Sequence, residues 1–279
     1  MTAHQPILER RDLRGECFRG MDLSAAVLQE RDLSDADFRG ARVRGIRIQT
    51  SELGNANFAG CDLTGADLSG TNLSNANFAG AILAGANLSA ANLPKAILIE
   101  ADLRGAILQQ SNLSHASLAG AVFASTDLAS ANLYLADLSN CRLANVTLTA
   151  ANLARATLRG NHLEEVNAVD AIFEFADLRE TNLFNCNFLR SNLVGAGFHA
   201  SRADFCQFSE ADFYWAELGG FTHHNCDFTG VRWPEEVKIA YGPRGVTPPK
   251  VAPVPLYRTA MTEEERKRLV ELHLGNAGR

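Results

Sequence analysis

The amino-acid sequence predicts an all-β repeat solenoid. From Ala56 to Leu93 a small residue, then Asp or Asn, then Leu or Phe, then two small or polar residues recur every five positions. A helix repeats its apolar positions every 3.6 residues and a strand every two, so neither has this period. A fixed period sustained over many units is the sequence signature of a repeat architecture.

The register of this repeat is continuous over most of the chain. We define the Leu or Phe of each pentapeptide as its centre. Steps of five lead from Leu8 to Trp233 without an insertion or deletion, which gives 46 pentapeptides, and 40 of the 46 centres are Leu or Phe. Three centres are not large apolar residues: Ala168, Ala203 and His223.

The spacing of phenylalanines indicates how many pentapeptides make one coil. Two sets of centres are exactly twenty residues apart: Phe18, Phe38, Phe58 and Phe78, and later Phe188, Phe208 and Phe228. Rings that stack on one another would need coils of twenty residues, hence four sides of one pentapeptide each. The Asp or Asn before each centre is expected to bond nearby backbone groups and favour a turn.

This pattern resembles the pentapeptide-repeat family, whose motif is A(D/N)LXX, over roughly residues 6–235. The resemblance implies a right-handed quadrilateral β-helix of about 11–12 coils. The centre and the small residue two positions before it would point inward, and the other three residues of each pentapeptide would face solvent. Residues 1–235 form this domain in our prediction, with an irregular N-terminal cap at about residues 1–20.

The C-terminal part leaves the repeat and is predicted to hold two further elements. Residues 236–261 are rich in proline and read as an extended connector. Residues 262–275 read as one short α-helix, with Thr262 as N-cap, Glu265 completing a capping box and Gly275 ending it. Because so short a helix is marginal alone, it should dock on its own chain or across a dimer contact.

The residues of this sequence that could carry chemistry do not form a pattern typical of an enzyme. The sequence has no catalytic constellation and no phosphate-binding glycine loop, so we expect no enzymatic activity and no cofactor. His223-His224 is better explained as a distortion near the solenoid end than as a metal site.

Five cysteines take inward small positions, and none forms a C-x-x-C pair, so free buried thiols are expected: Cys61, Cys141, Cys186, Cys206 and Cys226. The start of the chain lacks a signal peptide and no apolar run could span a bilayer, which predicts a cytoplasmic protein without a membrane partner.

Acidic residues concentrate in the last third of the repeat. The chain has a net charge of −6 overall, but residues 161–236 hold 13 Asp or Glu against four Arg. At about 4.8 Å per coil this is one net charge per ~2 Å, near the one per ~1.7 Å of duplex DNA. The candidate partner-facing acids are Glu164, Glu165, Asp170, Glu174, Asp177, Glu180, Glu210, Asp212, Glu217 and Asp227. The same acids would also suit a merely solubilising surface.

Family members that protect DNA gyrase and topoisomerase IV are dimeric DNA mimics joined through their C-terminal ends, so the resemblance implies such a role here. We therefore predict a homodimer that binds a type II topoisomerase, such as DNA gyrase, and protects it from poison antibiotics without binding nucleic acid itself. Its dimer contact would involve Phe188, Phe208, Phe228, Tyr214, Trp215, Leu269, Val270 and Leu274. The alternative is a generic protein–protein interaction scaffold that uses the aromatic last third or the exposed isoleucines Ile82, Ile97, Ile99 and Ile107.

Overall fold

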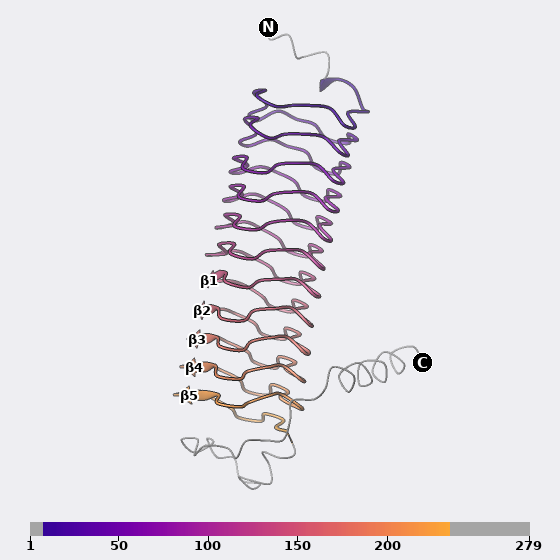
Figure 1. Cartoon of the computed structure of the whole chain (residues 1–279). Coiled ribbons are helices and arrows are strands. Elements are labelled where there is room, and N and C mark those ends of the chain that lie inside the picture. Colours follow the sequence, from indigo (N-terminus) through magenta and orange to yellow (C-terminus); the bar gives the residue numbers. More distant parts are fainter. Residues whose placement is uncertain (1–7, 235–279) are drawn as a thin grey trace, which may run out of the picture.

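The computed structural model describes residues 8–234, which form one parallel β-solenoid (Figure 1). Isolated parallel bridges join residues twenty apart, and eleven such steps lead from Asp12 to Arg232. The predicted coil of twenty residues and the predicted number of coils are therefore confirmed. The predicted connector at 236–261 and the predicted helix at 262–275 lie outside the described residues.

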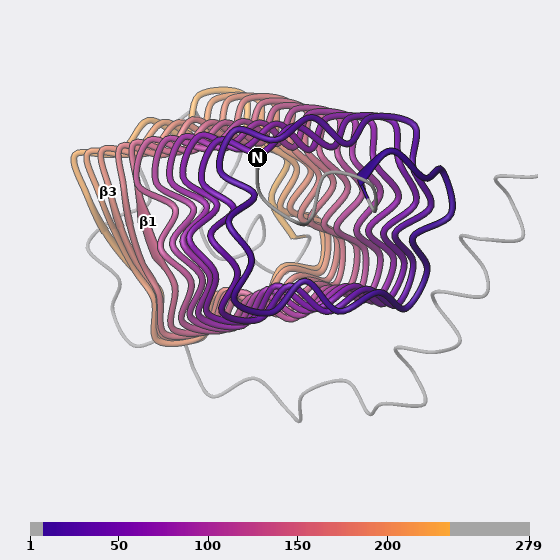
Figure 2. The same cartoon turned by 90° about the horizontal axis from the view of Figure 1, so that it is seen from above.

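Each coil has four sides, and the coils superpose as a four-sided outline when viewed along the axis (Figure 2). We number the sides by their centres, which recur every twenty residues. Side one begins with Leu13, side two with Phe18, side three with Leu23 and side four with Leu8 or Leu28. The last centres on these sides are Trp233, Leu218, His223 and Phe228, respectively.

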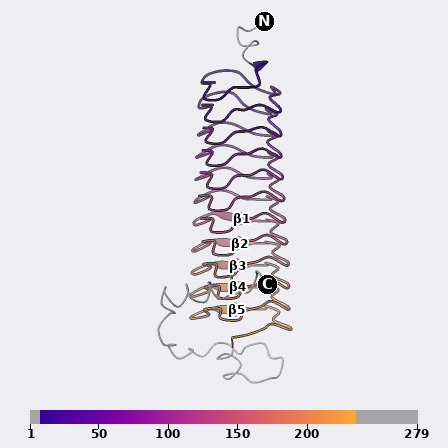
Figure 3. The same ribbon diagram turned by 90° about the vertical axis from the view of Figure 1, so that its right-hand side faces the viewer.

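Side three carries the regular strands of the molecule, stacked in chain order along the axis (Figures 1 and 3). They pair in parallel and in register, with Leu143 opposite Leu163 and Leu163 opposite Leu183. On this side the backbone stays extended one residue further than elsewhere in the coils. The strands are β1 (Arg142–Ala144), β2 (His162–Glu164), β3 (Asn182–Phe184), β4 (Arg202–Asp204) and β5 (Thr222–His224).

The corners between sides explain the polar residues of the motif. The second residue after a centre takes a left-handed conformation, with φ between 51° and 74° for the residues that do so. The residue before the centre supports the turn: Asp62 Oδ1 accepts the N–H of Thr64 at 2.9 Å, and Asn77 Oδ1 accepts the N–H of Ala79 at 3.0 Å. The expected side-chain-to-backbone bonds are thus confirmed.

The core lies inside the coils and consists of the centres and the small residues two positions before them. Phe18, Phe38, Phe58 and Phe78 stack with ring centroids 4.3 to 5.1 Å apart. Phe188, Phe208 and Phe228 form a second stack with spacings of 5.1 Å. The predicted inward positions and both predicted stacks are confirmed.

Unusual residues in the core compensate for one another in volume. Ala168 is a small centre on side four, and the rings of Phe173 and Phe188 meet beside it at 5.5 Å. Asn161 takes a small inward position but is buried with its amide satisfied, because Nδ2 donates to the Leu138 carbonyl at 2.8 Å and Oδ1 accepts the Cys141 N–H at 2.9 Å. Dense packing and paired polar groups therefore survive these departures from the motif.

Candidate interaction surface

The ten candidate acids do not share one face of the solenoid. Their positions in the coil place Glu164 and Glu165 on side three and the others on the remaining three sides. Six of the ten side chains are exposed, and Glu174, Asp177, Asp212 and Glu217 are half-buried. The last coils therefore present negative charge in every direction around the axis rather than as a single patch.

Arginines neutralise part of this charge locally. Arg190 and Asp170 pair at 2.8 Å between neighbouring coils, and Arg232 pairs with Asp212 at 2.9 Å in the same way. Asp177 pairs with Arg179, and Glu180 with Arg159. Because the side chains in these pairs are 23 to 56% exposed, each pair contributes little to stability, but it does lower the local field.

The titration of these carboxylates follows their hydrogen bonds. Hydrogen bonds from the Arg190 side chain lower the pKa of Asp170. Burial acts to raise the pKa of Asp177, but the bonds from the Arg179 side chain and backbone lower it overall. The side-chain and backbone bonds from Thr229, with a further bond from Ser209, lower the pKa of Asp227. These groups therefore stay ionised at neutral pH.

An exposed aromatic ridge runs down the corner after side three. Phe184 at the end of β3 is 40% exposed, and Phe205, just after β4, is 49% exposed. Their rings meet edge to face with centroids 5.7 Å apart, and the ring of His224 continues the ridge 5.6 Å from Phe205. The sequence pattern does not predict this contact, because the two phenylalanines are 21 residues apart and occupy different places in the pentapeptide.

A second aromatic cluster lies on side one near the end of the described chain. The rings of Tyr214 and Trp215 are 4.6 Å apart, and the Arg232 guanidinium lies 4.2 Å above the Tyr214 ring. Both aromatic side chains are half-buried. A cation above an aromatic face is an attractive contact that holds such a surface in place.

The remaining predicted dimer residues divide into two groups. Phe188 and Phe208 are fully buried in the core of their own chain and Phe228 is 9% exposed, so their rings are engaged within the stack. The same spacing of twenty that stacks these rings also buries them, and their part in a dimer contact stays a prediction. Leu269, Val270 and Leu274 lie outside the described residues.

The four isoleucines of the alternative contact are exposed by 37 to 42%, but they do not form one patch. Ile97 and Ile99 lie on side two, whereas Ile82 is on side three and Ile107 on side four. Sides two and four are opposite one another across the coil. A flat partner could therefore reach Ile97 and Ile99 together, but not the whole set.

A comparison with families of known proteins decides the family. The family described as "Pentapeptide repeats (8 copies)" matches this chain over residues 12–49 and, in overlapping segments, over residues 51–204. The chain belongs to the pentapeptide-repeat family. A comparison with curated proteins returned no match.

Solved structures of other pentapeptide-repeat proteins resemble the chain. HetL from Nostoc sp. strain PCC 7120, described as involved in heterocyst differentiation regulation, is 26% identical, with 83% of this chain and 94% of HetL covered and a TM-score of 0.36. QnrB1, a plasmid-mediated fluoroquinolone resistance protein, is 16% identical, with 81% and 99% covered and a TM-score of 0.39. Rfr23 from Cyanothece 51142 is 25% identical, with 48% and 85% covered and a TM-score of 0.20.

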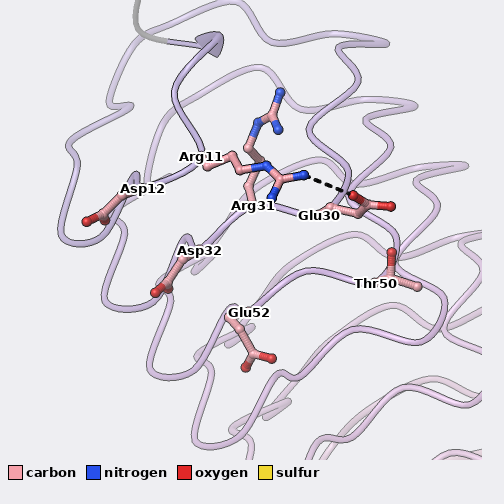
Figure 4. Close-up of a pocket in the computed structure, with 7 residues that line it drawn as sticks. All are labelled: Arg11, Asp12, Glu30, Arg31, Asp32, Thr50 and Glu52. Carbon is pink, nitrogen blue, oxygen red and sulfur yellow. Dashed lines mark ion pairs between the residues drawn. The ribbon is translucent and has the colours of Figure 1, made fainter.

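The N-terminal coils of this pentapeptide-repeat protein contain a charged hollow at the corner between sides four and one (Figure 4). Arg11 faces Glu30 there with 3.6 Å between their charged atoms, and the carboxylates of Asp12, Asp32 and Glu52 follow one another down the solenoid. The hollow thus mixes both charges. Arg31 Nε is buried beside it without a hydrogen-bond partner in the described part of the chain.

The paired histidines His223 and His224 are the remaining candidates for chemistry in residues 8–234. No group of three or more His, Cys, Asp or Glu side chains there could hold a metal ion. His223 takes a centre position next to Phe228, with its ring 5.0 Å from the Phe228 ring, while His224 points to the aromatic ridge. The same range contains no helix long and apolar enough to cross a bilayer.

Proposed function

We propose that this protein is a non-enzymatic DNA mimic that binds a type II topoisomerase, DNA gyrase in particular, and protects it from poison antibiotics. The observation that carries the proposal is the excess of acidic residues on all four sides of the last coils. A DNA duplex is also negatively charged in every direction around its axis. Complementary charge of this kind steers a partner and fixes its register.

The charge density supports the proposal quantitatively. Within residues 161–234 there are eleven Asp or Glu and four Arg, a net charge of −7. At about 4.8 Å per coil these 74 residues span roughly 18 Å, which gives one net charge per ~2.5 Å. Duplex DNA carries one per ~1.7 Å, so the last coils approach a duplex even with their ion pairs counted.

The proposed assembly is a homodimer through the C-terminal coils. The half-buried pair of Tyr214 and Trp215 supplies aromatic surface there, and aromatic residues are enriched in protein interfaces. Sedimentation equilibrium of the full chain should give twice the monomer mass. The double variant Tyr214→Ser, Trp215→Ser should shift the protein to monomer. A monomeric parent protein would contradict the assembly.

A supercoiling assay with purified gyrase tests the function. The protein should inhibit supercoiling at high dose and relieve a quinolone at low dose. The triple variant Glu164→Gln, Glu165→Gln, Glu210→Gln removes three exposed charges from the acidic coils and should weaken both effects about tenfold or more. The matched control is a triple variant that removes the same charge from the earlier coils and should leave both effects intact. Its substitutions are Glu30→Gln, Glu52→Gln and Glu100→Gln.

Absence of any effect on any type II topoisomerase at any dose would refute this function.

The exposed ridge of Phe184, Phe205 and His224 favours the second candidate, a generic protein–protein interaction scaffold. Exposed large aromatics beside one another are typical of protein-binding surfaces. In that case Phe184→Ser with Phe205→Ser should abolish capture of the partner, while the three glutamate substitutions in the acidic coils should not.

A further inference from the structure

One corner of the last coils carries the only exposed phenylalanines among residues 8–234. Phe184 is 40% exposed and Phe205 is 49% exposed, and their ring centroids are 5.7 Å apart. Phe184 ends β3, Phe205 follows β4 and His224 ends β5, so the aromatic ridge follows the stacked strands of side three (Figures 1 and 3). The ridge is therefore a feature of one side of the rod.

The stability of the fold does not explain why Phe205 is there. Its φ of 56° is left-handed, a conformation that disfavours bulky side chains. Earlier coils place glycine at the same corner position, namely Gly45, Gly65, Gly85 and Gly105, with φ of 63° to 65°. Because about half of the Phe205 ring is in water, its burial compensates little for this conformation. A role toward a partner accounts for such a residue better than packing does.

The backbone beneath the ridge is fixed by bonds between coils. The N–H of Phe205 donates to the His224 carbonyl at 2.9 Å, and the N–H of Asn185 donates to the Asp204 carbonyl at 3.0 Å. Phe184 pairs in register with Asp204 across β3 and β4. Because the rings stand on hydrogen-bonded backbone, a partner that binds them loses little conformational entropy in ordering this surface.

Two free carboxylates lie one coil before the ridge. Glu164 pairs in register with Phe184, Glu165 is the next residue, and both side chains are exposed. Within residues 8–234 neither carboxylate forms an ion pair or a side-chain hydrogen bond. Asp204 differs, because Arg202 donates two bonds to it at 2.6 and 3.1 Å. The surface therefore combines apolar rings with free negative charge on one flank, which is complementary to an apolar recess beside a Lys or Arg.

The acidic charge of the last coils has no preferred direction around the axis. The ten candidate acids lie on all four sides, so their charge alone does not favour one rotation of the rod in a basic groove over another. The aromatic ridge lies at a single corner, and the two free glutamates lie on the same side. A one-sided apolar contact can therefore fix the rotation, and it can distinguish one basic partner from others.

We propose that the aromatic ridge orients this protein on its partner, with Phe184 and Phe205 inserted into an apolar recess on the basic DNA-binding surface of the topoisomerase. A Lys or Arg beside that recess pairs with Glu164 and Glu165. This inference rests on the proposed function and names the residues that select the enzyme. The acids on all sides bring the two proteins together, and the ridge holds them in one orientation.

Binding kinetics of the full chain on immobilised gyrase test the ridge. Long-range charge governs the association rate, whereas a packed apolar contact governs the dissociation rate. Phe184→Ser with Phe205→Ser should leave the association rate within about twofold and raise the dissociation rate at least about tenfold. Relief of a quinolone in the supercoiling assay should weaken with it.

The matched control is Ile97→Ser with Ile99→Ser, which removes two side chains of 37% and 40% exposure from side two in the earlier coils. It should change neither rate. Circular dichroism of both double variants should equal that of the parent, because all four side chains are exposed.

A further double variant, Glu164→Gln with Glu165→Gln, tests the cation beside the recess. It should raise the dissociation rate of the parent protein by more than it raises that of the variant without the two phenylalanines, because the carboxylates and the rings act on one place of the partner. Equal effects in the two backgrounds would overturn the pairing of ring and carboxylate.

The failure of the ridge differs from the failure of the proposed function. A parent protein that binds no type II topoisomerase overturns the function and this inference together. A parent protein that binds gyrase, while its variant without Phe184 and Phe205 dissociates at the parent's rate, overturns the ridge alone. Dissociation that the Ile97 and Ile99 control accelerates equally would also overturn it, because any exposed apolar pair would then serve.

Discussion

Gly195 and Phe175 offer a sharp test of packing at a solenoid corner. Gly195 has a φ of +64°, and a methyl group at its Cα would overlap Cε1 of the Phe175 ring, one coil earlier, and lie 2.5 Å from Cδ1 of that ring. Gly160 occupies an equivalent corner with a φ of +72°, yet a methyl group there would meet nothing within 4 Å. The substitutions Gly195→Ala and Gly160→Ala therefore share a backbone cost and differ in one contact.

The magnitude follows from these two contributions. A left-handed conformation costs a residue with a side chain about 1–2 kcal/mol, and both variants carry this cost. Carbon atoms prefer separations of about 3.5–4.0 Å, so in Gly195→Ala the ring must move away. If the displaced ring exposes about 40–80 Å² of apolar surface, the further loss is about 1–2 kcal/mol. Gly195→Ala should thus destabilise the protein by about that much more than Gly160→Ala.

Tryptophan fluorescence provides the assay, because both tryptophans, Trp215 and Trp233, lie in the last coils. Urea unfolding followed by this signal reports the region that contains Gly195, and circular dichroism reports the whole solenoid. Repeat arrays unfold by coupled neighbouring units, so both signals should be fitted together. A second pair of variants in a Phe175→Ser background completes the cycle, and there the excess cost of Gly195→Ala should vanish.

Two results would refute this reasoning. If Gly195→Ala and Gly160→Ala cost the same in the parent protein, the Phe175 ring does not lie over Gly195. If the excess cost persists in the Phe175→Ser background, it comes from the backbone rather than from the ring. The absolute cost of either alanine alone decides nothing, since alanine already occupies such left-handed corners at Ala150 and Ala200.

Three further predictions concern the core. Phe58→Ala, in the middle of the first stack, should lower the free energy of unfolding by about 3–5 kcal/mol in a urea titration. Phe205→Ala, which removes an exposed ring, should lower it by less than about 1 kcal/mol. Equal losses for the two variants would contradict the packing of the stack. Iodoacetamide should modify only the exposed Cys17 in the native protein, because the other five thiols are buried. Burial also raises the pKa of Cys141 to about 12, which keeps that thiol protonated. Rapid loss of more than one thiol would contradict this prediction. Burial lowers the pKa of His223, so the unfolded chain binds more protons and stability should fall as pH drops below about 6.5; His223→Phe should remove that part of the pH dependence, and an unchanged profile would contradict it.

Much of the fold could be predicted because the repeat has no gaps. The five-residue period predicts that Leu13 and every later centre point inward, and the spacing of twenty between phenylalanines predicts four sides. Interactions between neighbouring coils then follow from arithmetic alone, since each residue stacks on those twenty positions away. Fold and core were for this reason the most predictable properties of the chain.

The candidate surface was less predictable, because several contacts do not follow the spacing of twenty. Phe184 and Phe205 meet although they are 21 apart, since one turns outward just before a corner and the other at it. The acids were counted correctly from sequence, but their distribution over four sides and the pairing of Asp170 with Arg190 came from the coil geometry. Phe188 and Phe208 do follow the spacing of twenty, and they stack in the core.

The sequence by itself determined the repeat, the coil length, the inward positions and the acidic excess of the last third. These depend only on which residue types recur at which interval, and a solenoid converts intervals directly into neighbours. The tertiary structure decided which side each charge occupies, which acids are paired, and how large and small core residues such as Phe173 and Ala168 offset one another. Those properties depend on side-chain direction at the corners, where the backbone turns and a linear spacing no longer specifies what lies alongside.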